Sequence, residues 1–190
     1  MNRRLFAALV LTGALSVNAA EVPRPAPDYT VNMPDGKPVK LSQYKGKIVL
    51  VEFLLVTCPH CQNAARILSK YQKEYGPKGL QVIGVSIDPA ADAAAFQRDY
   101  AGGAFPIGAA PTRESVYGFL QYSLMSGTFY VPQIAIIDRS GVIREQHGGP
   151  NDTYLQNEEQ NFKASIEKAL AESPAKKSTS AATAPKKKAS

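Results

Sequence analysis

The chain has 190 residues, 44% of them hydrophobic, and its 22 Lys and Arg against 16 Asp and Glu give a formal net charge of +6 at pH 7. Two arginines near the start and five lysines near the end account for this excess, which leaves 15 basic against 16 acidic residues between positions 21 and 172. A nearly neutral body excludes a basic nucleic-acid-binding surface on the fold. Its length of about 150 residues is enough for one domain with one core.

Residues 1 to 20 have the pattern of a signal peptide. Arg3 and Arg4 precede an apolar stretch from Leu5 to Val17, and small residues follow up to Ala20. The apolar stretch is short for a membrane span, so we expect a cleaved signal and a periplasmic or otherwise exported protein, with an uncleaved membrane anchor as the alternative. Export would place the protein where disulfides form and persist.

The other end of the chain, residues 173 to 190, contains only Ser, Thr, Ala, Pro and Lys. A segment without large apolar side chains cannot bury enough surface to fold. We therefore expect a disordered basic tail, in weak contact with anionic surfaces, and a single domain from residue 21 to residue 172.

The first elements of this domain are strands. Tyr29 to Val31 and Val39 to Leu41 bracket the turn signal Met33-Pro34-Asp35-Gly36, a pattern that predicts an N-terminal hairpin. Residues 48 to 56 form an almost wholly apolar run, which is typical of a buried central strand. Glu52 is the single acid in this run.

Cys58-Pro59-His60-Cys61 follows the run, where a helical pattern begins, and holds both cysteines of the chain. The pattern makes Cys58 the helix N-cap, with Pro59 at the first helical position and Cys61 one turn on, on the same face. The two sulfurs can therefore meet and form a disulfide. An N-cap side chain faces free N–H groups and the positive end of the helix dipole, which favours a thiolate at Cys58.

Two other interpretations of the cysteine pair stay open. A zinc site needs four ligands, and beyond the cysteines only His60 and His147 remain as thiol or imidazole donors. A static structural disulfide is the other, although so small a loop removes little chain entropy. Redox exchange is favoured over both, and we expect no metal and no organic cofactor.

Strands and helices alternate after the motif. The apolar periodicity predicts helices from the motif to Gly76, from Asp88 to about Tyr100, from Thr112 to about Ser123 and from Asn157 to Glu172. It predicts strands at residues 80–87, 105–107, 133–137 and 142–146. The fold class is therefore α/β, with a mixed central sheet and helices on both faces.

Several stretches match one family in order and spacing: residues 35–42, 45–47, 58–61, 82–88, 131–134 and 136–141. On these, residues from about Gly36 to Glu172 resemble the thioredoxin superfamily, and in layout its exported TlpA-like or AhpC/TSA-like disulfide oxidoreductases. The resemblance implies a thioredoxin-like fold with an N-terminal hairpin extension and a short helical insertion. It also implies a thiol–disulfide oxidoreductase that acts on protein thiols and disulfides and exchanges electrons with a membrane-bound partner.

The same resemblance assigns roles to residues. Cys58 would attack and Cys61 resolve, His60 would tune the thiolate, and Pro59 would bind substrate together with Val131 and Pro132. Pro132 would be cis beside the cysteine pair, and the backbone of Val131 would pair with an extended substrate. An ordinary loop proline is the alternative for Pro132.

Glu52, six residues before Cys58, stands where thioredoxins carry a buried acid. Burial raises the pKa of a carboxyl and lets it pass a proton to or from Cys61. A glutamate at the strand edge that reaches water is the alternative.

The active-site sequence departs from the TlpA-like pattern. Thr57 stands where reductants of that branch usually have Trp, whereas the Cys-Pro-His-Cys motif, Glu52-Phe53 and Val131-Pro132 resemble the oxidant DsbA, without its long helical insertion. The direction of electron flow is therefore open.

Three other functions remain as alternatives. The first is a disulfide reductase for cytochrome c maturation. The second is a peroxiredoxin-like antioxidant, although Val51 and Leu55 replace the Pro and Thr that a peroxidatic site needs. The third is a non-enzymatic peptide- or metal-binding module, in which His147 could be a third copper ligand.

Overall fold

The computed structural model describes residues 20–88, 92–123, 127–149 and 152–172. The predicted signal peptide, apart from Ala20, and the predicted tail at residues 173–190 lie outside these ranges. Within them, no helix has the length and apolar character that crossing a membrane requires.

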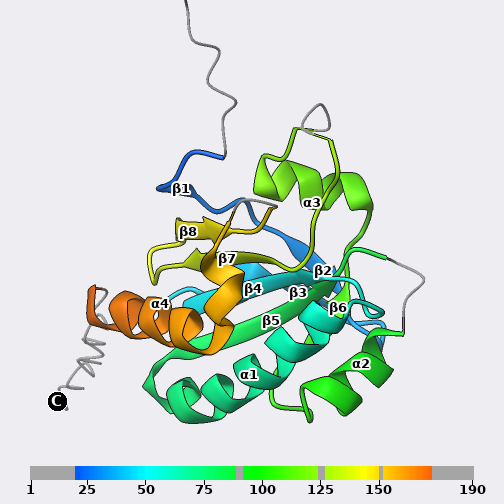
Figure 1. Ribbon diagram of the computed structural model, residues 1–190, viewed down its shortest axis with the longest axis horizontal. Helices are drawn as coiled ribbons and strands as arrows, with labels where there is room; N and C mark the ends of the chain where they lie inside the picture. Colours follow the sequence, from blue (N-terminus) through cyan, green and yellow to red (C-terminus); the bar gives the residue numbers. More distant parts are fainter. Residues whose placement is uncertain (1–19, 89–91, 124–126, 150–151, 173–190) are drawn as a thin grey trace, which may run out of the picture.

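A mixed sheet of eight strands forms the centre of the described part of the chain, in the order β1-β8-β7-β4-β5-β6-β2-β3 (Figure 1). The strands are β1 (Arg24–Pro25), β2 (Thr30–Asn32), β3 (Pro38–Lys40), β4 (Ile48–Leu54), β5 (Leu80–Ser86), β6 (Ile107–Ala109), β7 (Gln133–Ile137) and β8 (Val142–His147). β4 pairs in parallel with β5 and antiparallel with β7. The predicted mixed sheet and the β2–β3 hairpin are confirmed.

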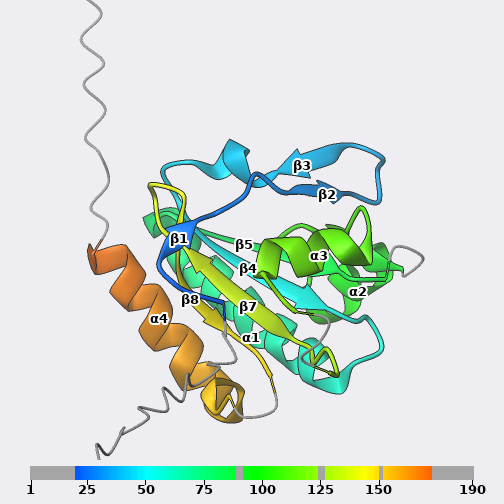
Figure 2. The same ribbon diagram turned by 90° about the horizontal axis from the view of Figure 1, so that it is seen from above.

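Helices cover both faces of the sheet, as predicted. They are α1 (Pro59–Tyr75), α2 (Ala93–Tyr100), α3 (Arg113–Leu120) and α4 (Glu158–Glu172), with 3-10 turns η1 (Leu41–Tyr44), η2 (Gly76–Lys78) and η4 (Tyr154–Asn157). Residues of α1, α2 and α4 share one apolar core with the sheet, and residues of α3 share the other (Figure 2).

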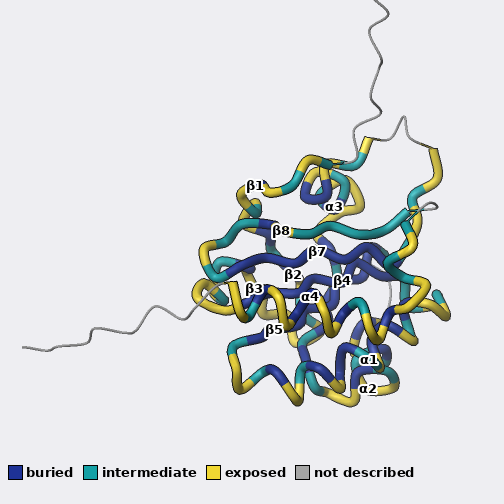
Figure 3. The backbone as a smooth tube through the Cα atoms, turned by 60° about the vertical axis from the view of Figure 1, so that its left-hand side comes forward, coloured by how far each residue is buried: buried dark blue, intermediate teal, exposed yellow. Residues whose placement is uncertain are grey.

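β4 connects these two cores and is buried along its whole length, at the dark centre of Figure 3. Because side chains alternate along a strand, Leu50 and Leu54 pack in the core with α1 and α4, whereas Phe53 packs in the core with α3. The ring of Phe53 lies 5.2 Å from that of Phe119 and 5.7 Å from that of Tyr29. Each large apolar side chain buried in this way contributes roughly 1.5–3 kcal/mol, so β4 is a rigid support for the residues that follow it.

Some predicted boundaries are wrong. The helix expected from Asp88 begins at Ala93, because the Asp92 carboxylate accepts a hydrogen bond from the amide of Ala95 at 2.7 Å and caps it. Helix α3 starts after Thr112 as predicted but ends at Leu120, where Gln121 adopts a left-handed conformation with φ 50°. The strand expected at residues 105–107 begins only at Ile107, since Pro106 has no N–H to donate.

Candidate active site

The two cysteines lie where β4 ends and α1 begins. Cys58 is the N-cap of α1, with extended backbone angles (φ −82°, ψ 119°), and Pro59 occupies the first helical turn. A bond from the amide of Cys58 to the carbonyl of Leu55, 3.1 Å long, closes the connecting turn. The predicted N-cap position is therefore confirmed, and it leaves Cys58 half-buried while Cys61, one turn on, is completely buried.

This difference in burial separates the chemistry of the two thiols. Both thiols are free. Burial, and next the negative charge of Glu52, raise the pKa of the Cys61 thiol far above its ordinary value, with only partial opposition from the backbone of Leu55. Cys61 therefore stays protonated until a base takes its proton, whereas the Cys58 sulfur is accessible.

Glu52 is fully buried within β4, opposite Gly84 of β5 and Ile134 of β7. Neither of its carboxyl oxygens has a hydrogen-bond partner among the described residues. Burial raises the pKa of Glu52 well above its ordinary value, and repulsion from Glu158 and Cys58 raises it further. The alternative of an edge residue that reaches water is wrong. The raised pKa makes the Glu52 carboxylate a stronger base than a solvated one.

The segment before β7 approaches the cysteine pair from elsewhere in the chain. The Val131–Pro132 peptide bond is cis, as the resemblance implies, and Pro132 is buried. The carbonyl oxygen of Val131 lies 3.9 Å from the sulfur of Cys58, across 73 residues of sequence. Tyr130, one residue before Val131, is 44% exposed, so an aromatic ring of this segment lies at the surface.

His60 and Pro59, the two residues between the cysteines, are both exposed. His60 lies at one side of an open cavity of about 780 Å³ between the start of α1 and the start of α4, which Asn63 and Glu158 also line. The predicted site residues thus fall into two groups: Cys58, Cys61, Glu52 and Val131-Pro132 converge, while His60 and Pro59 face outward.

Sequence reasoning missed Glu158. Its side chain is 7% exposed and accepts a hydrogen bond from the Asn63 amide at 2.5 Å. Burial raises the pKa of Glu158, which Asn63 and the charge of His60 oppose. Acidic residues at the start of a helix usually face water and complement the helix dipole. Glu158 instead lies four residues before Phe162, which faces inward, and this helical spacing was the signal in the sequence that Glu158 is buried.

His147, the other possible ligand, is engaged by its own neighbours. Its ring stacks on Tyr154, with the centroids 3.6 Å apart, and its nitrogens lie 3.5 Å from Glu145 and 3.4 Å from Asp152. Together with the Ser165 hydroxyl, 2.6 Å from the Glu145 carboxylate, these contacts join β8 to α4. In the described ranges, no group of three or more His, Cys, Asp or Glu side chains could hold a metal ion.

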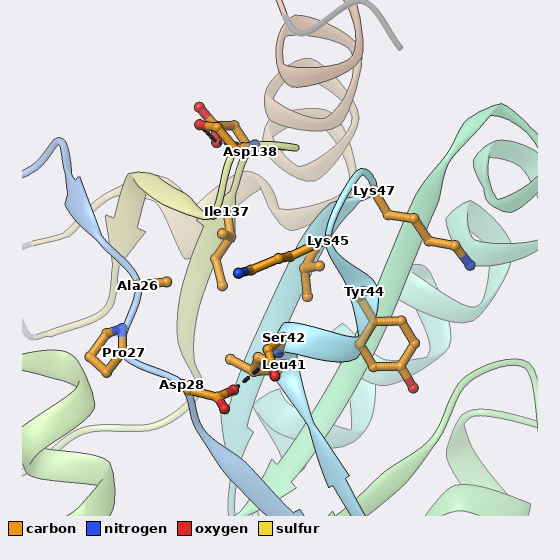
Figure 4. A pocket seen from close by; sticks show the side chains of 13 residues that line it. Ala26, Pro27, Asp28, Leu41, Ser42, Tyr44, Lys45, Lys47, Ile137 and Asp138 are labelled. Atoms are coloured by element: carbon orange, nitrogen blue, oxygen red, sulfur yellow. Dashed lines mark hydrogen bonds between the residues drawn. The ribbon is translucent and has the colours of Figure 1, made fainter. Parts of the chain in front are cut away.

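A second cavity, of about 330 Å³, lies at the opposite end of β4 (Figure 4). Leu41, Val49 and Ile137 contribute apolar surface to it, and Lys45 extends across it. The amide of Ser42 donates to the carboxylate of Asp28 at 3.1 Å on its rim. Because this cavity adjoins the start of β4, whereas Cys58 follows its end, it is separate from the cysteine site.

Comparisons with known proteins agree with this geometry. "Peroxiredoxin Q, chloroplastic" of Triticum aestivum is 37% identical over 75 residues, which are 39% of this chain and 35% of that protein. "Thioredoxin-like protein YneN" of Bacillus subtilis is 31% identical over 127 residues, 65% of this chain and 69% of that protein. The chain thus spans only about a third of the wheat relative but two thirds of the bacterial one.

Among solved structures, a thiol:disulfide interchange protein of the thioredoxin family from Chlorobium tepidum is similar with a TM-score of 0.63 and 26% identity. The similarity covers 80% of this chain and 99% of the Chlorobium chain. The model of the AhpC/TSA family matches residues 22–146, which include β4, the cysteine pair and the cis-proline segment. The chain therefore belongs to the AhpC/TSA family, within the thioredoxin superfamily.

Proposed function

We propose that the protein is an exported thiol–disulfide oxidoreductase that exchanges disulfides with protein substrates through Cys58 and Cys61. One observation carries this proposal: the accessible sulfur of Cys58 lies 3.9 Å from the carbonyl of Val131, while Cys61 is buried beside it. A substrate strand that pairs with the backbone of Val131 would bring its own cysteine to Cys58. The kinship with the Chlorobium interchange protein supports the same activity.

The burial of the two sulfurs gives an order of steps. The Cys58 thiolate attacks a substrate disulfide, forms a mixed disulfide and releases one substrate thiolate. Glu52 accepts the proton of Cys61, and the resulting thiolate attacks the Cys58 sulfur, which releases the second substrate thiolate. The cysteine pair is oxidised by two electrons and the substrate disulfide is reduced; the reverse sequence oxidises a substrate dithiol.

Catalysed exchange with a disulfide-containing protein tests this function. We expect the wild-type protein, mixed with glutathione at defined ratios, to speed the exchange and Cys58→Ser to lose that effect, because the accessible nucleophile is gone. The readout is the rate at which the substrate's disulfides equilibrate. A peptide-binding module would not need its cysteines, so equal rates for the two proteins would reject the proposal.

The cellular setting is part of the same proposal. The signal-peptide pattern of residues 1 to 20 supports export to a compartment where disulfides persist. A membrane-bound redox partner would then return the cysteine pair to its starting state after each turnover.

His60→Ala is expected to make the cysteine pair more reducing. His60 follows Pro59 at the start of α1, where an imidazole adds to the helix dipole in favouring the Cys58 thiolate and thus the reduced form. For this two-electron couple, ~1.4 kcal/mol of lost thiolate stabilisation lowers the reduction potential by about 30 mV, a shift that is readily measured.

The potential is measured by equilibration with glutathione, with His147→Ala, at the chain's other histidine, as the matched control. We expect the wild-type potential to lie above that of thioredoxin and the control to match the wild type. An unchanged or higher potential in His60→Ala would remove His60 as the tuning residue.

A further inference from the structure

We propose that Glu158 is the second carboxyl of a proton path, and that it passes the proton of the buried Glu52 to solvent in the cavity beside His60. This inference rests on the proposed function, because it concerns the proton that leaves Cys61 during exchange. Glu158 acts on the thiol chemistry through Glu52.

Glu52 needs such a route because of where β4 places it. The side chain is 0% exposed, in the core that α1 and α4 cover, and it has no direct access to bulk water. Its two oxygens are unpaired within the described residues, so no neighbouring donor there fixes the carboxyl in its charged form. A proton taken up there reaches bulk water only through another group or a water molecule.

Glu158 borders the core that holds this buried carboxyl, because it lies one turn before Phe162, which packs in that core with Leu50 and Leu54 on either side of Glu52. One oxygen of Glu158 accepts from Asn63, and the other is buried and unpaired in the part of the chain that the structure describes. The residue nevertheless lines the open cavity of about 780 Å³ together with His60 and Asn63. It is therefore enclosed on the side of the protein core and adjoins solvent on the other.

The surrounding charges favour one proton shared by the two carboxyls. Cys58, at the N-cap of α1, acts on Glu52, and His60 of α1 acts on Glu158. Glu52 in turn acts on Cys61, and the charge of Glu158 acts on Glu52. The charge of Glu158 raises the pKa of Glu52, and two coupled carboxyls do not both ionise readily. The adjacent Glu159 instead pairs with Lys70 at 2.5 Å on the surface and takes no part in the pair.

The proton balance of the path is simple. The transfer starts with the shared proton on Glu158 and with Glu52 as a carboxylate. The proton of the Cys61 thiol moves to Glu52, leaving the thiolate that attacks the Cys58 sulfur. Glu158 then gives its proton to water in the cavity, and Glu52 passes its own proton, directly or through a water molecule, to Glu158. Both carboxyls return to their starting states, and the electrons move only between sulfurs.

A single-turnover experiment separates the steps. The reduced full-length protein is mixed with an aromatic disulfide whose thiolate product is coloured, and two equivalents of product are followed over a pH series. Release of the first equivalent of coloured thiolate reports attack by Cys58, and release of the second equivalent reports resolution by Cys61. For Glu158→Gln we expect the rate of the first phase to be unchanged. The rate of the second phase, taken at the plateau of its pH profile, should be ~10-fold lower or more, because glutamine keeps the shape of the side chain but cannot accept a proton.

Matched variants decide between proton transfer and other roles. Glu159→Gln, one residue along the same helix, should match the wild type, and Glu158→Asp, which keeps a carboxyl but shortens the side chain, should lie between the wild type and Glu158→Gln. If the aspartate variant is as slow as the glutamine variant or slower, the role is one of shape and the relay is rejected. A shifted pH midpoint with an unchanged plateau would make Glu158 only an electrostatic neighbour, which also rejects the relay.

The outcomes that reject the relay can be distinguished from an outcome that rejects the proposed function. If the wild type released neither equivalent of coloured thiolate, the proposed exchange activity itself would be rejected. Two normal phases in Glu158→Gln, with a slow second phase in Glu52→Gln, would remove only the relay.

Discussion

A Cys61→Ser variant is expected to accumulate a covalent mixed disulfide with its substrate, while Cys58→Ser accumulates none. The sulfur of Cys58 is accessible beside Val131, so it can attack, whereas Cys61 is 0% exposed and can react only with its neighbour. Without the resolving thiol the adduct cannot decay by the normal path. Non-reducing electrophoresis and mass spectrometry of the trapped species would measure the adduct and locate its bond.

The double variant, with both cysteines changed to serine, is the control for adducts that form by unfolding or by non-covalent association. Adducts through Cys61 in the Cys58→Ser protein would reverse the assignment of attacking and resolving sulfur. That result would also require Cys61 to become exposed, which hydrogen exchange at the start of α1 could detect.

Glu52→Gln is expected to slow the resolving step by ~10²-fold, with attack by Cys58 nearly unchanged. Glutamine fills the same space among β5, β7 and α1 but cannot accept the Cys61 proton. The pH dependence of the resolving step should change as well, because its titrating base is gone. A resolving rate and a pH profile equal to those of the wild type would reduce Glu52 to a packing residue.

The same variant has a signature in stability, with a definite sign. Because the folded-state pKa of Glu52 is raised above its ordinary value of 4.5, its favourable contribution is complete below that value and is lost as the pH rises through the raised pKa. The free energy of unfolding of Glu52→Gln relative to the wild type should therefore increase from about pH 4.5 upward. Denaturant titrations at several pH values would measure it, and a constant difference would contradict the buried, titrating carboxyl.

The strongest local signals in the sequence predicted the parts of the fold that position the site. The apolar run at residues 48–56 and the Cys58-Pro59 pair fix where the central strand ends and the helix begins, because burial and helix capping are local in sequence. The contact between Cys58 and Val131 joins residues 73 apart, and no periodicity encodes it. Only the family resemblance placed Pro132 beside the cysteines.

What escaped prediction depends on packing between distant elements. Arg24–Pro25 looks like an extended segment, and it becomes β1 only because β8 offers it an edge. Glu158 is one of two adjacent acids at a helix start, and which one is buried depends on how α4 rests against α1 and β4. Asn63, which donates to it, lies 95 residues earlier in the chain.

The order of the sheet also bears on how copies of this protein avoid one another. Its outermost strands in the described chain, β1 and β3, have two and three residues, and each contains a proline, Pro25 and Pro38. Short edges in which a proline removes one of the few N–H donors are poor templates for edge-to-edge aggregation. The proposed recruitment of an extended substrate at Val131 would therefore take place on a protein whose sheet margins resist the same kind of pairing.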